Sequence, residues 1–522
     1  MSLKPILLTA SALAFSASTA MADYSLTVLH TNDFHARFEP ISKYDSPCSA
    51  EDNAEGKCFG GSARLVTAVA EARARTNNSI LVSGGDQFQG TLFYTYYKGA
   101  MAAEFMNLLG YDAMTVGNHE FDDGPEVLRG FMDTINFPIL MSNADVSGEE
   151  LLAGELAKST IIERGGRKIG LIGLTPQNTD ELASPGPGVV FTDPAEAVAG
   201  EVAKLEEAGV NIIIVLSHSG YAVDQAVAAA VPAVDVIVGG HTNTFLSNDN
   251  DRADGPYPTM VGNTAIVSAY AYGKYLGELN LTFDDEGNIT ETSGGPISMS
   301  GDVAEDEAAV ARIAELAEPL NEIRQRVVAQ SAEAIDGDRG SCRAVECQMG
   351  NLIADAMLDR VADQGVTIAI QNGGGIRASI DAGEVTMGEV LTVLPFQNTL
   401  ATFQISGAGV IEALENGVSQ VEDGAGRFPQ VAGIRFVWDP AAEAGSRIVS
   451  VTLADGSAID PAATYGVVTN NYVRGGGDGY KIFSSDAMNA YDYGPGLENV
   501  MADYMLAQGA YTPYLDGRIA QK

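Results

Sequence analysis

The feature that most constrains the fold of this chain is a recurring apolar run, rich in Val, Ile and Leu, that ends in a short polar or glycine-rich segment. Such runs occur at residues 26–29, 80–82, 113–116, 169–174, 212–216, 234–238 and 265–267. Amphipathic helical stretches, such as residues 62–75 and 194–208, separate several of them. Uninterrupted apolar strands that alternate with helices are typical of sheets covered on both faces. Residues 24–285 are therefore predicted to form an α/β unit.

Metal-binding side chains follow these runs. Four of the five histidines do so, in the segments NDFH, GNHE, SHSG and GGHT, and a fifth segment, GGD, supplies Asp86. In α/β folds, ligand groups gather at the carboxyl ends of strands. A lone histidine at a strand end is more often structural, and His30 is assigned no chemistry. Five such segments together predict one mixed site of His, Asp and Asn. Such sites suit transition metals, and a metal pair can hydrolyse phosphate esters.

Individual residues of these segments have suitable positions. Asp33 and His35 are two residues apart, so they point the same way on an extended segment. The carboxylate of Asp86 has two oxygens and is a candidate bridge between two cations. Asn118 offers a neutral carbonyl oxygen, and the histidines offer ring nitrogens. Two cations about 3.5–4 Å apart would lower the pKa of a water and hold phosphate oxygens.

The length of 522 residues predicts more than one domain. Residues 302–328 are rich in Ala, Glu and Leu, and they are predicted to form one long connecting helix, with Pro319 as a kink. The predicted organisation is a leader at 1–22, a first domain at 23–301, a linker helix at 302–330 and a second α/β or α+β domain at 331–522. The second domain holds two glycine-rich segments, NGGGIR and RGGGDGY.

The N-terminus has the pattern of a secretion signal. Lys4 precedes an apolar stretch at residues 6–15, and Ala20-Met21-Ala22 is a small-residue cleavage pattern. Export to the periplasm or the exterior, with cleavage near Ala22, is therefore expected. A membrane anchor is not expected, because the later sequence has no apolar run of about 18 residues and the C-terminal end is polar.

The four cysteines form two close pairs in sequence, Cys48 with Cys58 and Cys342 with Cys347. In an exported protein, two local disulfides are the simplest interpretation. The alternative, a zinc ribbon, is disfavoured because these spacings do not match the usual CxxC ligand pairs.

The chain is strongly acidic, with 69 Asp and Glu against 30 Lys and Arg and a net charge of −39. Such a surface repels polyanions, so binding of nucleic-acid polymers is disfavoured. A small anionic substrate would need a local positive centre, which metals and a few arginines can provide.

The segments NDFHA, GGDQFQG, GNHEFD, SHSG and GGHTNTF, in this order, resemble the calcineurin-type metallophosphoesterase half of the 5′-nucleotidase family. The resemblance implies a four-layer α/β/β/α sandwich, joined by a long helix to a smaller α/β substrate domain. It implies two divalent ions (Zn, Mn or Co), one held by Asp33, His35 and Asp86 and the other by Asp86, Asn118, His218 and His241. It also implies a catalytic dyad of His119 and Asp122; taken alone, Asp122 could simply begin a helix.

The second half extends the resemblance through CRAVECQMGN and NGGGIR. It implies that the Cys342–Cys347 bridge holds Arg343 in a fixed loop. Arg343 and Arg377 suit a phosphate or a carboxylate, since guanidinium forks bind oxyanions in a bidentate way. Further implied contacts are a nucleobase stacked between Phe396 and Tyr472, ribose hydroxyls on Asp478, and the base or sugar on Asn372. Tyr472 stands where many relatives carry Phe.

The sequence therefore predicts an exported enzyme that hydrolyses nucleoside 5′-monophosphates. Alternatives within the superfamily are a 2′,3′-cyclic nucleotide phosphodiesterase and a nucleotide-sugar pyrophosphatase. A thiosulfate-ester hydrolase is less favoured, because paired aromatic rings and Asp478 have no evident use there. An exported nucleotide-binding protein without activity would need the arginines and the rings but not the metal cluster.

Overall fold

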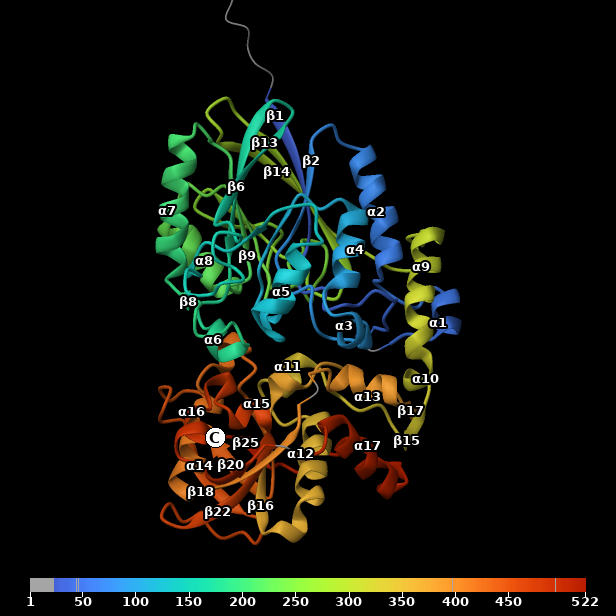
Figure 1. Cartoon of the computed structure of the whole chain (residues 1–522), viewed down its shortest axis with the longest axis vertical. Helices are drawn as coiled ribbons and strands as arrows, with labels where there is room; N and C mark the ends of the chain where they lie inside the picture. The colour runs from blue at the N-terminus through green and yellow to red at the C-terminus, as the bar shows by residue number, and fades with distance from the viewer. Residues whose placement is uncertain (1–22, 44, 46, 397, 493) are drawn as a thin grey trace, which may run out of the picture.

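The structure is a computed structural model that describes residues 23–522 except 44, 46, 397 and 493. The predicted leader, residues 1–22, lies outside the described residues. The chain forms two α/β halves stacked along its long axis, the first coloured blue to green and the second orange to red (Figure 1).

The N-terminal half contains two six-stranded sheets. The first has the order β14-β13-β1-β2-β3-β4 and the second β11-β12-β10-β9-β7-β6. The strands of the first sheet are β1 (Tyr24–Thr31), β2 (Ser79–Ser83), β3 (Ala113–Thr115), β4 (Ile139–Leu140), β13 (Tyr275–Phe283) and β14 (Ile289–Ser298). Those of the second are β6 (Ser159–Arg164), β7 (Arg167–Leu174), β9 (Ile213–Ser217), β10 (Val236–Val238), β11 (Thr259–Val261) and β12 (Thr264–Val267).

The N-terminal half has four layers, a helical layer, two sheets and a second helical layer, and an apolar core lies between each layer and the next. One core lies between the sheets and joins residues such as Val82 of β2 to Leu216 of β9. A second packs the first sheet against α2 (Ser62–Ala74) and α4 (Ala100–Leu109). A third packs the other sheet against α7 (Pro194–Glu207) and α8 (Tyr221–Ala230). The predicted α/β/β/α sandwich is therefore confirmed. The strands read as continuous apolar runs because side chains on both of their faces are buried.

Parallel pairing sets the position of the polar segments. Strands β1, β2 and β3 run parallel in one sheet, and β7, β9 and β10 run parallel in the other. Their carboxyl ends, and the segments that follow them, therefore lie at one edge of the sandwich.

The connector differs from the predicted single helix over residues 302–328. The chain forms α9 (Glu307–Ala317), a 3₁₀ turn, η2 (Glu318–Leu320), and α10 (Asn321–Arg324), and then enters strand β15 (Val327–Ser331). The break lies at Pro319, which has no N–H to donate and disfavours a helical conformation in the residue before it. Side chains hold α9 on the first half, since Arg312 pairs with Glu104 and Tyr97 donates its hydroxyl to the carbonyl of Leu316.

The C-terminal half is built around a five-stranded sheet of order β19-β16-β22-β18-β23. Its strands are β16 (Val366–Asn372), β18 (Leu400–Ser406), β19 (Pro429–Ala432), β22 (Thr464–Asn470) and β23 (Met488–Tyr491). Helices α12 (Gln348–Arg360) and α17 (Leu497–Gln508) share an apolar core with one face, and α14 (Gly407–Gly417) shares a core with the other. Two three-stranded sheets, of order β17-β15-β24 and β21-β20-β25, complete this half. Their further strands are β17 (Gly383–Thr386), β20 (Ile434–Trp438), β21 (Ile448–Leu453), β24 (Ala510–Tyr511) and β25 (Ile519–Gln521).

Both predicted cysteine pairs are joined, Cys48 to Cys58 and Cys342 to Cys347. Among the described residues, no helix combines the length and the apolar character that crossing a membrane requires.

Candidate metal centre and substrate cleft

The polar strand-end segments converge on one point. Asp33 and His35 follow β1, Asp86 follows β2, Asn118 follows β3, His218 follows β9 and His241 follows β10. All are buried except His241, which is partly exposed. Four of them, Asp33, His35, Asp86 and His241, have positive φ values of 50° to 71°. Backbone of this kind is costly for residues other than glycine and gathers at functional sites.

Asp86 lies at the centre of the cluster. Its Oδ2 is 2.9 Å from Nε2 of His218 and 3.8 Å from Nε2 of His35. Two sets of potential ligand atoms, each within 4.8 Å of one another, share this residue: Asp33, Asp86 and His218 form one, and His35, Asp86 and His119 form the other. A carboxylate common to two sets is suited to bridging two cations.

Backbone carbonyls fix two of the imidazoles. Nδ1 of His218 lies 2.6 Å from the carbonyl oxygen of Gly84, and Nδ1 of His35 lies 3.1 Å from that of Phe88. A carbonyl oxygen accepts hydrogen bonds and cannot donate, so Nδ1 carries the proton in both rings. Nε2 is then the nitrogen that each ring could offer to a metal; that of His218 faces Asp86, and that of His35 faces Arg377 and, farther away, Asp86.

Asp33, Asn118 and His241 belong to the same cluster. The backbone N–H of His241 donates to Asp33 Oδ2 at 3.0 Å, and Nδ1 of His241 lies 3.0 Å from Oδ1 of Asn118. Asp33 Oδ1 is 3.9 Å from Nε2 of both His35 and His218. All six predicted metal ligands are therefore in one place.

The carboxylates and imidazoles of this cluster shift one another's pKa. Burial opposes ionisation of Asp86, but the imidazoles of His218 and His119 hold the pKa of its carboxyl well below the usual range. Burial likewise opposes a charged His218, yet Asp86 and Asp33 raise the pKa of that imidazole to about 10. Buried carboxylates of this kind demand a positive partner. The donor set of imidazole nitrogens and carboxylate and amide oxygens fits divalent transition metals.

The two residues of the predicted dyad are in contact. Nδ1 of His119 lies 2.6 Å from Oδ2 of Asp122. Burial opposes a charged ring, but Asp122 raises the pKa of the His119 imidazole above its ordinary value. The ring also stacks on Phe396 of the C-terminal half, with centroids 5.6 Å apart and planes 24° apart. By contrast, His30 is buried away from the cluster, with Nε2 2.8 Å from the hydroxyl oxygen of Tyr257.

Glu120 is a residue that sequence reasoning missed. Its fully buried carboxylate accepts hydrogen bonds from the backbone N–H groups of Asp86 (3.0 Å), Gln87 (2.8 Å), Phe88 (3.3 Å) and Gly117 (2.6 Å). One side chain thus joins the loop after β2 to the loop after β3. The signal was present, since Glu120 directly follows His119 in GNHEFD. Its four hydrogen bonds could not be predicted from that position, because they depend on the two loops lying side by side in the fold.

Arginines of the C-terminal half face the cluster. Nη2 of Arg377 lies 3.1 Å from Nε2 of His35, and Nη2 of Arg339 donates to the carbonyl of His241 at 2.9 Å. Arg343, which directly follows Cys342 of the disulfide, donates from Nη1 to the carbonyl of Gly424 at 3.2 Å. Arg339 was not predicted. It lies four residues before Arg343, in a segment whose polar loop character gave no reason to single it out.

The remaining predicted residues line the same cavity. This cavity, of about 1200 Å³, lies between the two halves and is bordered by Phe396, Tyr472, Asn372 and Asp478, as well as by the arginines and by every predicted metal ligand except His218. Asn372 donates from Nδ2 to Asp478 Oδ2 at 2.7 Å. A cationic wall thus faces a set of metal ligands, and aromatic and hydrogen-bonding groups lie beside them. The arrangement can hold a phosphate ester with an attached ring system.

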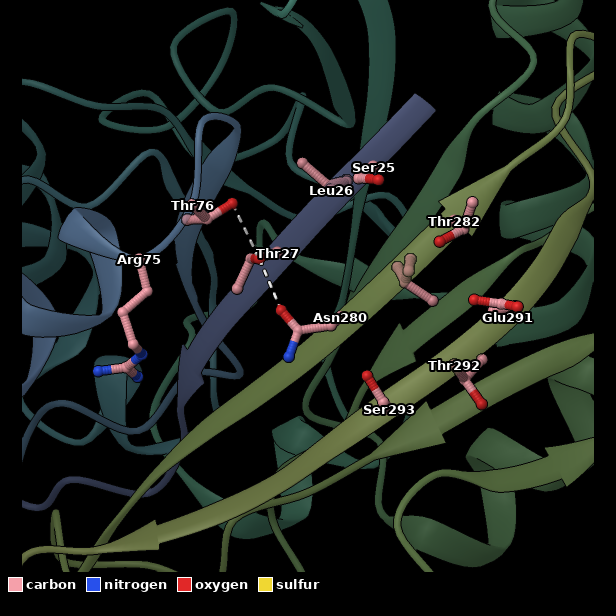
Figure 2. Close-up of a pocket in the computed structure, with 11 residues that line it drawn as sticks. Ser25, Leu26, Thr27, Arg75, Thr76, Asn280, Thr282, Glu291, Thr292 and Ser293 are labelled. Atoms are coloured by element: carbon pink, nitrogen blue, oxygen red, sulfur yellow. Dashed lines mark hydrogen bonds between the residues drawn. The ribbon is translucent and has the colours of Figure 1, made fainter. Parts of the chain in front are cut away.

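A second hollow, of about 410 Å³, lies elsewhere on the N-terminal half, over β1, β13 and β14 (Figure 2). At its centre, the hydroxyl of Thr27 bonds to Asn280 at 2.7 Å and to Thr76 at 3.2 Å. These groups already satisfy one another, and we assign the hollow no chemistry.

Comparison with known families agrees with this division. Residues 26–245 match the model of the calcineurin-like phosphoesterase family, and residues 327–485 match that of the 5′-nucleotidase C-terminal domain. The chain is 38% identical to snake venom 5′-nucleotidase from Gloydius brevicauda, with 99% of this chain and 92% of the relative covered. It is 37% identical to the 5′-nucleotidase of Homo sapiens, with 96% and 91% covered.

Two solved structures resemble this chain over nearly its whole length. The crystal structure of a 5′-nucleotidase precursor from Thermus thermophilus superposes with a TM-score of 0.91 at 39% identity, over 95% of this chain and 99% of that one. The structure of the NAD nucleotidase of Haemophilus influenzae matches with a TM-score of 0.57 at 26% identity, over 96% and 99%.

Proposed function

The chain belongs to the 5′-nucleotidase family, and we propose that it hydrolyses nucleoside 5′-monophosphates to a nucleoside and phosphate. One observation carries the proposal: Arg377 of the C-terminal half lies against His35 of the N-terminal metal-ligand cluster. A phosphate bound by the arginines would therefore be next to any cation held by the cluster. The work is divided between residues 23–301, which supply the reaction centre, and residues 331–522, which hold the nucleotide.

We propose that Asp33, His35 and Asp86 hold one divalent ion and that Asp86, Asn118, His218 and His241 hold a second. Zn²⁺, Mn²⁺ and Co²⁺ all accept this donor set. Such ions supply Lewis-acid chemistry, since they lower the pKa of water and neutralise charge on phosphate oxygens. The carbonyl contacts of His35 and His218 hold Nδ1, so Nε2 is the nitrogen that each ring would give to an ion; the ion would then replace the contacts that Nε2 makes with Arg377 in His35 and with Asp86 in His218.

The side chains of the dyad act on the phosphate ester itself. His119 carries its proton on Nδ1 or Nε2, and the carboxylate of Asp122, 2.6 Å from Nδ1, favours a proton at Nδ1 and holds the ring. The raised pKa of His119 favours a second proton at Nε2. From there the ring can donate a hydrogen bond to a phosphoryl oxygen or to the leaving oxygen.

The C-terminal half binds and orients the nucleotide. Arg343 and Arg377 would contact the phosphate, and Arg339, whose guanidinium lies at the carbonyl of His241, adds a third positive group. Phe396 and Tyr472 would enclose the base, and stacking on such rings is worth about 1–3 kcal/mol per base. Asp478 and Asn372 would contact the sugar or the base. These contacts are useful only when the two halves approach each other, as they do in this conformation.

A second candidate activity is cleavage of larger nucleotides, such as dinucleotides or nucleotide sugars. The cavity volume of about 1200 Å³ favours it, because sites for small molecules usually measure about 300–1000 Å³. A panel of AMP, UDP-glucose, NAD and 2′,3′-cyclic CMP, with all products separated by chromatography, separates the activities: AMP gives phosphate and adenosine, the two pyrophosphates give nucleoside monophosphates, and cyclic CMP gives an acyclic nucleotide. Preferred release of phosphate from AMP supports the main proposal. Binding of all four without turnover would instead indicate a nucleotide-binding protein.

We further propose that the protein works outside the cytoplasm. Two disulfides in a chain with no free cysteine among the described residues are typical of secreted or periplasmic proteins.

A further inference from the structure

The side chain of Gln430, on β19, binds the backbone of the loop that carries Arg343. This loop runs from Cys342 to Cys347, the residue immediately before α12. Nε2 of Gln430 donates to the carbonyl oxygen of Cys342 at 3.0 Å and to that of Val345 at 2.7 Å. Its Oε1 accepts from the backbone N–H of Cys347 at 3.1 Å. One amide therefore contacts the loop at both ends and in the middle.

The amide of Gln430 has a single possible orientation. The side chain is fully buried, and β19 places it opposite Gln371 of β16. A Cβ at Gly350 of α12 would lie 2.4 Å from Cγ of Gln430, so the helix backbone packs directly on the side chain. If the amide were reversed, its oxygen would face two carbonyl oxygens and no donor. Because buried amides need their partners, the loop and Gln430 hold each other in place.

Strand β19 also fixes the glycine segment that precedes Arg377. The backbone N–H of Gly373 donates to the carbonyl oxygen of Phe428, just before β19, at 2.8 Å. A Cβ at Gly373 would lie 2.3 Å from the carbonyl oxygen of Cys342 and 3.3 Å from Cγ of Arg343. The glycine segment therefore touches both the loop and the stem of Arg343. Through these contacts, β19 sets the relative positions of the two guanidinium groups.

Arg343 has few contacts of its own that could hold it. Its Nη1 donates to the carbonyl of Gly424 at 3.2 Å, and its buried Nε has no hydrogen-bond partner among the residues that the structure describes. Burial, followed by the charges of Arg339 and Arg377, lowers the pKa of the Arg343 guanidinium well below its usual range. A guanidinium repelled by its neighbours depends on its loop for its position.

We propose that Gln430 is a positioning residue for phosphate binding: it holds the 342–347 loop and thereby places Arg343 where a phosphate group binds. The inference rests on the proposed nucleotidase function, in which Arg343 contacts the phosphate. Gln430 itself is buried outside the cavity lining, so it acts only through the loop. The effect should be large, because a displacement of about 1 Å in a binding group can lower a rate by about 10²-fold.

Two substitutions test the role of this amide. Gln430→Glu keeps the shape and the acceptor for Cys347 but removes the NH₂ group that donates to two carbonyls, and Gln430→Met removes all three hydrogen bonds. In protein supplied with Mn²⁺, the measurements are kcat/KM for AMP and the Kd values of inorganic phosphate and of adenosine by calorimetry. The value of kcat/KM and the affinity for phosphate should fall by about 10–100-fold. Adenosine, which has no phosphate, should bind as it does to the wild type.

Gln404→Glu is the matched control. It makes the same substitution at an exposed position of the same sheet, where the amide oxygen accepts from Nδ2 of Asn489 at 2.8 Å. A carboxylate oxygen can accept this bond equally well. The variant should therefore bind phosphate and cleave AMP like the wild type.

A double-mutant cycle with Arg343→Ala separates positioning from a general role in the fold. If Gln430 acts through Arg343, adding Gln430→Glu to Arg343→Ala should cause no further loss of phosphate affinity. A substitution that only weakens the fold would lower the affinity by the same factor in both backgrounds.

Wild-type phosphate affinity in a folded Gln430 variant would overturn the inference, as would equal losses for phosphate and adenosine or the same loss in the Arg343→Ala background. If neither Gln430 variant folds, the residue serves the fold and the inference is likewise overturned. A wild-type protein that binds phosphate but does not cleave AMP would instead remove the nucleotidase proposal. The phosphate measurements would then still decide the role of Gln430.

Discussion

Nη2 of Arg377 lies 3.1 Å from Nε2 of His35, although 342 residues separate them in the sequence. A guanidinium cannot accept a hydrogen bond, so the lone pair of His35 Nε2 faces the arginine. This lone pair is also the one that a metal would use. The C-terminal half thus reaches the metal-ligand cluster with a positive charge at the position where a bound phosphate would need one.

Arg377→Ala should therefore lower kcat/KM for AMP by about 10²–10³, since removing one partner of a buried charged contact typically costs about 2–5 kcal/mol. Bound metal should remain, because Arg377 is not a ligand. The measurement is steady-state phosphate release together with metal content. Arg435→Ala is the control, because Arg435 forms an exposed pair with Asp516; a similar loss in that variant would argue against a specific role.

His119→Ala separates a catalytic histidine from a metal ligand. If His119 acts on the ester, its loss should cut kcat by about 10²–10⁴ while metal content and KM change little. The two roles need separating, because Nε2 of His119 lies only 3.9 Å from Oδ2 of Asp86. Loss of metal in parallel with activity would make His119 a ligand instead.

Glu120→Gln tests whether the buried carboxylate positions Asp86. Each of its oxygens accepts two backbone N–H groups, whereas the amide NH₂ of Gln would face two of these donors and has no lone pair with which to accept them. Metal affinity, measured by titration with a chelating dye, should fall by about 10–100-fold, as for other groups that orient ligands. Glu126→Gln, at an exposed position of the same region, should leave affinity unchanged. Equal affinity in the two variants would refute the positioning role.

The buried carboxyl of Asp235, which lies outside the metal-ligand cluster, should make the stability of the fold depend on pH. Burial raises the pKa of its carboxyl to about 7, against about 3.9 in an unfolded chain. Between these values the folded protein binds the extra proton, so stability contributed by this group is lost as pH rises from about 4 to about 7. Asp235→Asn keeps an acceptor for the N–H of Ile213 and removes the charge. Its Tm relative to wild type should therefore rise by about 2–4 °C between pH 5 and pH 8. A Tm difference independent of pH would contradict the role of this carboxyl.

Much of the N-terminal half could be predicted from local patterns. Apolar strands such as β9 and β10 need no distant information, and parallel strands bring their carboxyl ends together wherever they lie in sequence. The meeting of Asp33, Asp86 and His218 follows from that rule. The roles of these residues as ligands remain predictions.

The features that were missed depend on contacts between segments. Glu120 acquires its function from four N–H groups on two different loops, and Arg339 from a carbonyl in the other half of the molecule. No local pattern encodes either. The connector was predicted as one helix because Ala, Glu and Leu favour helices throughout 302–328. Pro319 divides it, and pairing with β17 (Gly383–Thr386) turns residues 327–331 into a strand.

The proposed two-metal reaction is tested most directly by phosphate release from AMP, using protein stripped of metal and then resupplied with Zn²⁺, Mn²⁺ or Co²⁺, with Asp86→Ala treated in parallel. We expect that stripping abolishes release, that at least one ion restores it with about two ions bound per chain, and that Asp86→Ala recovers neither metal nor activity. Release that persists without metal, or an Asp86→Ala protein with full activity, would contradict the proposal.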